Sequence, residues 1–394
     1  MDFTVAPKPP WETVVFQQSA FPDESLLKQC SQITYTASWN ELSHELLNAV
    51  KAKIEPLEKN HVWEILKKRT NPYELVYTQD NSDCPSSISI TKPLSRSYFK
   101  MVEILSVANF FERIPKTVQK IRSAHVAEGP GGFIEAVLDR SSLYRLPISK
   151  IFAMTLKPTN SHIPGWRRAF TFLQKHPEIK IHYGEDGTGD LYSIANQNSF
   201  IELFQLTKAQ LFTGDGGFDF SVDYENQEKI MFTLLSASAI TGLQVLNMDG
   251  TFVLKLFDIF SSSTQLLLRL ITFCFKEWTL YKPSMSRPCN SERYLVCRGF
   301  RKVFPQILQL LKQIEQNASI NLFPNVEYFS FFNEKERDYL EQHIREFNQH
   351  QIENIEKTIA LQSDTSEKYD WKPQYKLAQQ WCSQFRVPST KPKI

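Results

Sequence analysis

The stretch SAHVAEGPGGFIEAVLDR at residues 123–140 joins a strand-like apolar run to a helical pattern through a glycine-rich turn. In open α/β sheets, ligands bind at the carboxyl ends of the strands, where glycines let the backbone approach closely. A dinucleotide is disfavoured, because Ile134 replaces the last glycine of its fingerprint and the next strand ends in Met154-Thr-Leu-Lys157 without the expected acid. No Gly-Lys-Ser/Thr follows, which excludes a Walker phosphate loop. Glycine-rich turns are often purely structural, and only the position of this turn after the first predicted strand favours a ligand site.

Six further apolar runs follow this first strand. They are KIFAMTL, IKIHYG, AQLFTGD, GTFVLKLF, WTLYKP and RYLVCRGF, at residues 150–156, 179–184, 209–215, 250–257, 278–283 and 293–300. Helical patterns lie between most of them, and this alternation predicts a doubly wound parallel sheet with helices on both faces. The loop between the last two runs is too short for a helical crossover, so these strands should pair antiparallel. The predicted fold class is α/β, Rossmann-like, mostly parallel with a C-terminal antiparallel hairpin.

The flanks of this region differ in pattern. Residues 1–90 are predicted to be a partly helical extension, with a helix that begins at Ser38 because Ser38 and Glu41 form a capping-box pattern. Residues 304–394 are predicted to be a helical extension that ends in a frayed tail. Its longest helix carries an apolar stripe, which an ordinary packing role explains; the stripe is Leu340, Ile344, Phe347, Ile352, Ile355 and Ile359.

Composition excludes several classes of protein. The net charge is only +2, so global charge does not indicate a nucleic-acid binder. No apolar run reaches the roughly 18 residues of a membrane span, and the N-terminus lacks a signal-peptide core. The six cysteines are scattered without a Cys-x-x-Cys pair, which favours a reducing compartment and argues against a zinc site. The histidines show no ligand spacing either, so we expect no metal.

Two lysines stand where apolar side chains belong. Lys255 interrupts the predicted central strand at residues 251–257. Lysine is rarely buried without a partner or a task, and burial beside another cation favours the neutral amine, which can act as a general base. An edge-strand lysine that reaches water is the alternative. Lys100 forms a narrow polar stripe with Glu103 and Ser106 on an otherwise apolar helix, which predicts that it faces an internal site.

Acidic residues follow several of the predicted strands. Asp215 comes directly after the fourth strand, and Glu292 precedes the last one. Asp186 and Asp190 follow the third strand, where the adenine edge of a nucleoside cofactor would lie. A carboxylate there could accept a hydrogen bond from the exocyclic amine, although an ordinary polar turn explains either residue equally well.

An ordered series of motifs extends from Arg69 to Arg301. It comprises Asn71-Pro-Tyr-Glu74, Lys100, Glu128-Gly-Pro-Gly-Gly-Phe133, Met154-Thr-Leu-Lys157, Asp215-Gly-Gly-Phe218, Glu225-Asn226, Val253-Leu-Lys-Leu-Phe-Asp258, Lys282-Pro283, Ser286-Arg-Pro288 and Asn290-Ser-Glu-Arg-Tyr294. This series resembles the FtsJ-like 2′-O-methyltransferases, particularly the mRNA cap-1 ribose methyltransferases of eukaryotes and large DNA viruses. The resemblance implies an S-adenosylmethionine-dependent methyltransferase domain over residues 91–303.

The resemblance also implies roles for individual residues. Lys255 would activate a ribose 2′-hydroxyl, while three partners orient and tune it, which gives the catalytic set Lys100, Asp215, Lys255 and Glu292. The cofactor would be held by Glu128, Gly129, Pro130, Gly131, Gly132, Phe133, Thr155, Asp190 and Asp215. RNA or its cap would lie near Asn71, Glu74, Glu225, Asn226 and Arg287.

The implied function is methylation of the first transcribed nucleotide of 5′-capped mRNA. The alternatives are the second cap nucleotide, a ribosomal or transfer RNA site, and a catalytically silent RNA-binding subunit of a capping complex. The expected partners are RNA and other capping or transcription proteins, with no membrane. The expected location is intracellular, in the nucleus or cytoplasm, or in a virion if the protein is viral.

Overall fold

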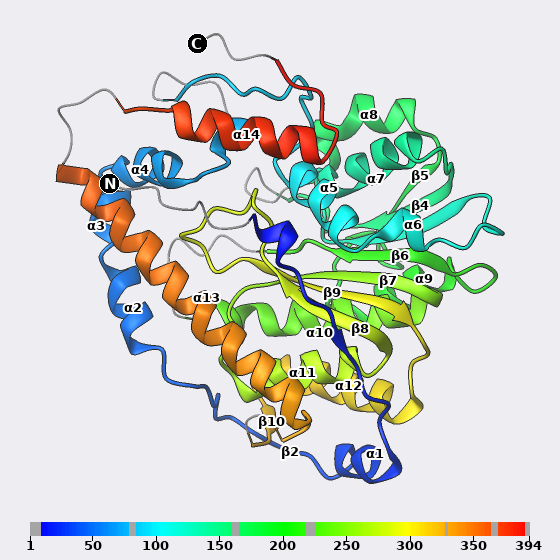
Figure 1. Ribbon diagram of the computed structural model, residues 1–394. Coiled ribbons are helices and arrows are strands. Elements are labelled where there is room, and N and C mark those ends of the chain that lie inside the picture. Colours follow the sequence, from blue (N-terminus) through cyan, green and yellow to red (C-terminus); the bar gives the residue numbers. More distant parts are fainter. Residues whose placement is uncertain are drawn as a thin grey trace.

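A sheet of eight strands forms the centre of the molecule (Figure 1). The computed structural model describes residues 9–78, 84–159, 165–217, 226–327, 330–363 and 369–390. The strand order is β1-β8-β9-β7-β6-β3-β4-β5. The strands are β1 (Gln17–Gln18), β3 (Ile121–Val126), β4 (Ile148–Met154), β5 (Ile179–His182), β6 (Ala209–Gly214), β7 (Leu246–Leu256), β8 (Phe275–Tyr281) and β9 (Arg293–Phe300). A separate antiparallel pair joins β2 (Thr34–Thr36) to β10 (Phe323–Asn325).

The pairing confirms the predicted fold class. Strands β5, β4, β3, β6 and β7 are parallel neighbours, whereas β9 pairs antiparallel with both β7 and β8. All seven predicted strands are present. The short edge strand β1, which pairs antiparallel with β8, was not predicted, because two polar residues carry no strand pattern.

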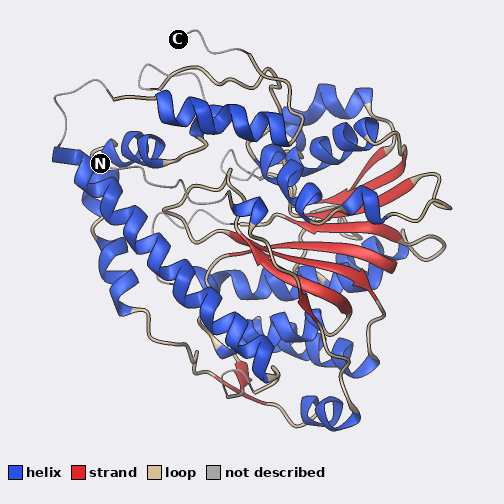
Figure 2. Ribbon diagram, viewed as in Figure 1, coloured by secondary structure: helices blue, strands red, loops and turns tan. Residues whose placement is uncertain are grey.

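Helices cover both faces of the sheet (Figures 1 and 2). Successive side chains of β7 point to opposite faces, so Val253 packs in one apolar cluster with α5 and α7, and Phe252 and Leu254 pack in another with α10, α11 and α12. The helices are α1 (Glu24–Cys30), α2 (Glu45–Ala52), α3 (Glu55–Lys59), α4 (Val62–Thr70), α5 (Ser97–Val107), α6 (Phe110–Arg113), α7 (Gly132–Leu143), α8 (Phe170–Lys175), α9 (Ile194–Glu202), α10 (Gln227–Val245), α11 (Ser262–Thr272), α12 (Pro305–Ala318), α13 (Glu334–Ala360) and α14 (Lys372–Gln384).

The helix predicted to begin at Ser38 begins instead at Glu45, as α2. The preceding residues are extended, and their backbone groups pair with the segment ahead of α11. Leu42 donates its N–H to Phe260, and Asn40 accepts from Ser262, both at 3.0 Å. These long-range bonds replace the local bonds that a helix would need.

The C-terminal extension packs along the sheet domain. The predicted long helix is α13, which runs beside α2 and α4 (Figure 1). The predicted fraying of the tail is wrong as far as Thr390, because Ile90 and Thr390 donate backbone N–H groups to Pro388 and Ile88 at 3.0 and 2.8 Å. Among the described helices, none combines the length and apolar character needed to cross a membrane.

Candidate functional site

Two ion pairs meet at the carboxyl edge of the parallel strands. The Lys100 Nζ atom, from α5, lies 2.7 Å from Oε1 and 2.8 Å from Oε2 of Glu292, just ahead of β9. The Lys255 Nζ atom, from β7, lies 3.3 Å from Oδ1 of Asp215 and donates to its backbone oxygen at 2.8 Å. The structure therefore brings together all four residues that the sequence nominated as catalytic.

The charges of this cluster act on one another. Burial alone would raise the pKa of Glu292, but the positive charges of Lys100, Lys255 and Lys282 lower it to about 2. Glu292 is therefore a carboxylate near neutral pH. Because both lysines of the predicted set act on this carboxylate, the two ion pairs form one electrostatic unit.

Lys255 lies inside the sheet. Its strand, β7, pairs with β6 on one side and β9 on the other, so the edge-strand alternative is wrong. The loop after β6 passes close to the amine, since a Cβ added at Gly217 would lie 3.1 Å from Lys255 Nζ. Only glycine allows this close approach without displacing the amine.

Two residues of the cluster were missed by sequence reasoning. Tyr294 stands opposite Lys255 in the β7–β9 ladder and donates its hydroxyl to Asp215 Oδ1 at 2.8 Å. Lys282 donates to the backbone oxygens of Asn290 and Glu292 at 2.8 and 2.9 Å. Burial, reinforced by nearby cations, lowers the pKa of Lys282 to about 7, although Glu292 opposes the shift. The hairpin register was the signal that could have revealed Tyr294.

Glu103, the second member of the polar stripe on α5, fixes that helix to its surroundings. Its Oε1 atom accepts hydrogen bonds from Tyr281 and from the N–H and hydroxyl of Ser284, the last two at 2.8 and 3.0 Å. Its Oε2 atom accepts from Trp381 of α14 at 2.7 Å. The polar stripe was predicted from the sequence, but no function was predicted for Glu103.

The predicted cofactor loop forms a tight turn at the start of α7. Gly131 has a φ of +105°, a backbone conformation that residues with a side chain rarely adopt. A Cβ added at Gly132 would lie 2.3 Å from both Ser95 Oγ and Ser97 Oγ. Gly129 and Pro130 are half-buried, whereas Phe133 is packed in the core and presents no surface to a ligand.

Glu128 lies in a buried polar network below this turn. Its carboxylate contacts His125 Nδ1 at 3.0 Å and accepts the hydroxyl of Thr213. Burial raises the pKa of Glu128, although these two hydrogen bonds oppose the shift. Glu128 thus links β3 to β6 beneath the loop.

The ends of β4 and β5 form the other half of the predicted cofactor site. The backbone at Gly189 lies against Thr155, where an added Cβ would be 2.0 Å from the Thr155 oxygen. Asp190 Oδ1 accepts only the local N–H of Tyr192 among the described contacts, at 2.9 Å. Leu156, which follows Thr155, and Tyr192, two residues after Asp190, remain 41% and 43% exposed, and neither was predicted as a site residue.

Asp186 is engaged differently from Asp190. Its Oδ1 atom accepts hydrogen bonds from the N–H and hydroxyl of Thr188 and from the amide of Asn196. These hydrogen bonds lower the pKa of Asp186. Asp186 therefore closes its own turn, which matches the polar-turn interpretation.

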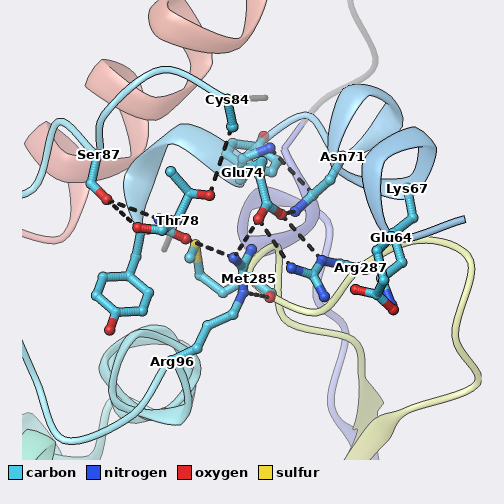
Figure 3. Close-up of polar contacts among 12 residues, drawn as sticks. Glu64, Lys67, Asn71, Glu74, Thr78, Cys84, Ser87, Arg96, Met285 and Arg287 are labelled. Atoms are coloured by element: carbon cyan, nitrogen blue, oxygen red, sulfur yellow. Dashed lines mark hydrogen bonds and ion pairs between the residues drawn. The ribbon is translucent and has the colours of Figure 1, made fainter. Parts of the chain in front are cut away.

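The residues predicted to lie near the RNA or cap differ in their exposure to solvent. Asn71 and Glu74 are fully buried, and the Asn71 amide donates to Glu74 Oε2 at 2.6 Å (Figure 3). Arg287 is partly exposed and paired with Glu74. Asn226 is exposed at the N-cap of α10, and Glu225 lies outside the described residues.

Comparisons with known proteins identify the family of this chain. The FtsJ-like methyltransferase family model matches residues 93–300. A Trypanosoma cruzi protein named cap-specific mRNA (nucleoside-2′-O-)-methyltransferase 1 is 33% identical over 211 residues, covering 52% of this chain and 56% of that protein. The Drosophila melanogaster protein of the same name is 31% identical over 268 residues, covering 65% and 31%. A Danio rerio cap-specific mRNA (nucleoside-2′-O-)-methyltransferase 2 is 32% identical over 247 residues, covering 58% and 32%.

The matched stretches thus span about half or less of these relatives' lengths. The family match includes three of the loops described above, the glycine-rich turn, the loop after β6 and the loop before β9, together with α5 and β7. The chain therefore belongs to the FtsJ-like methyltransferase family.

Proposed function

We propose that this chain transfers a methyl group from S-adenosylmethionine to the ribose 2′-hydroxyl of the first transcribed nucleotide of capped mRNA. The observation that carries the reaction is the cluster of two ion pairs, Lys100 with Glu292 and Lys255 with Asp215, at one edge of the sheet. The relatives named for cap methylation support the choice of RNA. The match to a methyltransferase 2 keeps the second transcribed nucleotide as the runner-up.

The carboxyl edge of the sheet fits the proposed cofactor. The backbone of Gly131 and Gly132, which leaves no room for side chains, would hold the methionine part. Asp190 would accept from the adenine amine, with Leu156 and Tyr192 as apolar faces for the ring. When bound, S-adenosylmethionine supplies an electrophilic methyl group on a cationic sulfonium.

The ion pairs then have distinct tasks. Lys255, as the neutral amine that a general base requires, would accept the proton of the attacking 2′-hydroxyl. Asp215 stabilises the resulting ammonium, and Tyr294 holds that carboxylate in place. The Lys100–Glu292 pair orients the ribose, because together they present a donor and an acceptor at fixed positions.

Lys255→Ala tests the mechanism. Transfer should fall by about 10²- to 10⁴-fold, the usual contribution of a positioned base, while the affinity for S-adenosylmethionine stays within about twofold. The matched control is Lys276→Ala, because Lys276 lies on β8 of the same sheet and is half exposed. Unchanged turnover of Lys255→Ala would refute the mechanism.

The substrate is tested by methylating defined transcripts with and without a 5′ cap and mapping the modified ribose. Modification of the first nucleotide of capped RNA supports the proposal, and modification of the second supports the runner-up. Equal activity on uncapped RNA would remove cap specificity. Cofactor binding without any transfer would instead indicate a silent RNA-binding subunit.

This substrate also bears on location and partners. The proposal places the protein inside the cell, in the nucleus or cytoplasm, where capped transcripts occur. Capping or transcription proteins are its expected macromolecular partners, beside RNA. Co-purification with such proteins from native extract, compared with a fold-matched unrelated methyltransferase, tests this expectation.

A further inference from the structure

The buried carboxylate of Glu74 lies between the side chains of Arg96 and Arg287 (Figure 3). Glu74 is fully buried and contacts Arg287 through both oxygens, with Nε at 3.2 Å from Oε2 and Nη2 at 3.0 Å from Oε1. Arg96 Nη1 lies 3.2 Å from Glu74 Oε1. A bidentate arginine–carboxylate contact is strong and directional, so this arrangement fixes the arginines relative to each other.

The two arginines belong to the two segments that carry Lys100 and Glu292. Arg96 is the N-cap of α5 and precedes Lys100 by about one helical turn. Arg287 lies in the loop that leads to Glu292. Arg96 also donates to Met285 of that loop at 3.1 Å, and to Tyr77 near Glu74 at 2.7 Å. Glu74 therefore bridges the helix and the loop that supply one catalytic ion pair.

The charge of Glu74 is needed for this bridge. Burial alone would raise the pKa of Glu74, but Arg96, Arg287 and the Asn71 amide hold it below its ordinary value. Arg96 is also attracted by Glu292, and its buried Nη2 has no hydrogen-bond acceptor among the described residues. Without the Glu74 charge, Arg96 would compete with Lys100 for Glu292.

We propose that Glu74 is a positioning residue, which keeps α5 and the Glu292 loop in register so that Lys100 and Glu292 meet. Glu74 acts through Arg96 and Arg287 and touches neither RNA nor cofactor. This inference rests on the proposed function of the Lys100–Glu292 pair. It also replaces the expectation that Glu74 contacts the cap.

The test compares full-length wild-type protein with Glu74→Gln, Arg287→Gln and the double variant. Glu55→Gln is the matched control, because Glu55 is an exposed carboxylate that pairs with Lys59 and with neither arginine of the bridge among the described contacts. We expect Glu74→Gln to lower kcat on capped RNA by roughly 10- to 100-fold, as small misplacements of catalytic groups do, with KM changed less than about twofold. The double variant should lose no more than Glu74→Gln alone, because Glu74→Gln already disrupts the contact that Arg287→Gln removes.

Other outcomes would overturn the inference. A raised KM with unchanged kcat would mean that Glu74 contacts RNA, and a lowered Tm with unchanged kcat would mean a purely structural role. If Glu74→Gln does not fold, Arg287→Gln decides, since it removes only the loop side of the bridge and must lower kcat.

A crystal structure of Glu74→Gln separates this inference from the proposed function. We expect the Lys100–Glu292 contact to be opened in the variant. A contact that persists at its wild-type distances of 2.7 and 2.8 Å would overturn the positioning role, whatever RNA the enzyme methylates. Conversely, an opened contact together with a fully active Lys255→Ala variant would refute the proposed mechanism alone.

Discussion

Replacement of Trp381 by phenylalanine should destabilise the protein although this residue lies outside the stretch that the family model matches. Trp381 is fully buried on α14, with its ring 5.8 Å from Phe99 and 4.8 Å from Phe385. Its indole N–H donates to Glu103 Oε2 at 2.7 Å. The substitution removes this donor and part of the packed ring, and it leaves a buried carboxylate oxygen without its partner.

The magnitude follows from two contributions. Leaving a buried acceptor without its hydrogen-bond partner costs about 1 to 3 kcal/mol. The missing ring atoms, on the order of 40 Å² of apolar surface, cost about 1 kcal/mol at roughly 25 cal/mol per Å². The free energy of unfolding should therefore fall by about 2 to 4 kcal/mol.

Urea unfolding followed by far-UV circular dichroism measures this change. Trp371→Phe is the matched control, because Trp371 is half-buried and its indole N–H bonds to no other described residue. A loss below about 0.5 kcal/mol for Trp381→Phe, or a loss equal to that of the control, would refute the reasoning.

Two further predictions concern the cluster and the cofactor loop. Gly132→Ala should weaken binding of S-adenosylmethionine and lower the free energy of unfolding, each by about 1 to 3 kcal/mol. The cause is the new methyl group, which would lie 2.3 Å from Ser95 Oγ and Ser97 Oγ. Wild-type values in both calorimetric titration and urea unfolding would contradict this prediction. The pKa of Lys282 is about 7 in the folded protein, against about 10.4 in the unfolded chain. Between these pH values the unfolded state binds more protons than the folded state. The free energy of unfolding should therefore rise with pH, by up to about 1.4 kcal/mol per pH unit. The rise between pH 7 and 9 should be smaller in Lys282→Met than in Lys276→Met, and equal slopes in the two variants would show that Lys282 does not cause it.

The sheet could be predicted from the sequence because its strands are local patterns. Strands such as β3, β6 and β9 are mostly apolar runs, and such runs predict burial on both faces. Lys100 and Lys255 were also visible, since a charge inside an apolar run stands out in one sequence. Asp215 and Glu292 were not visible in this way, because acidic residues in loops are common, and family resemblance supplied them.

Features that depend on long-range contacts could not be predicted. Glu74 stands among aromatic and apolar residues at positions 73–77, where a charge is unexpected, and its ion pairs with Arg96 and Arg287 explain its complete burial. The segment before α2 carries a sound local capping pattern, yet pairing with residues 260–262 overrides it. In both cases the residues whose contacts decide the local structure are distant in the sequence. Hydrophobic periodicity does not reveal such long-range contacts.

Both large apolar clusters draw members from outside residues 93–300. Leu47, Val50 and Leu340 share one cluster with the sheet, and Trp381 and Phe385 share the other. Excision of the matched stretch would expose these contact surfaces, and large exposed apolar patches promote aggregation. The flanks are therefore not detachable modules: an exchange of either flank between relatives would have to be accompanied by compensating substitutions in the sheet's own packing partners.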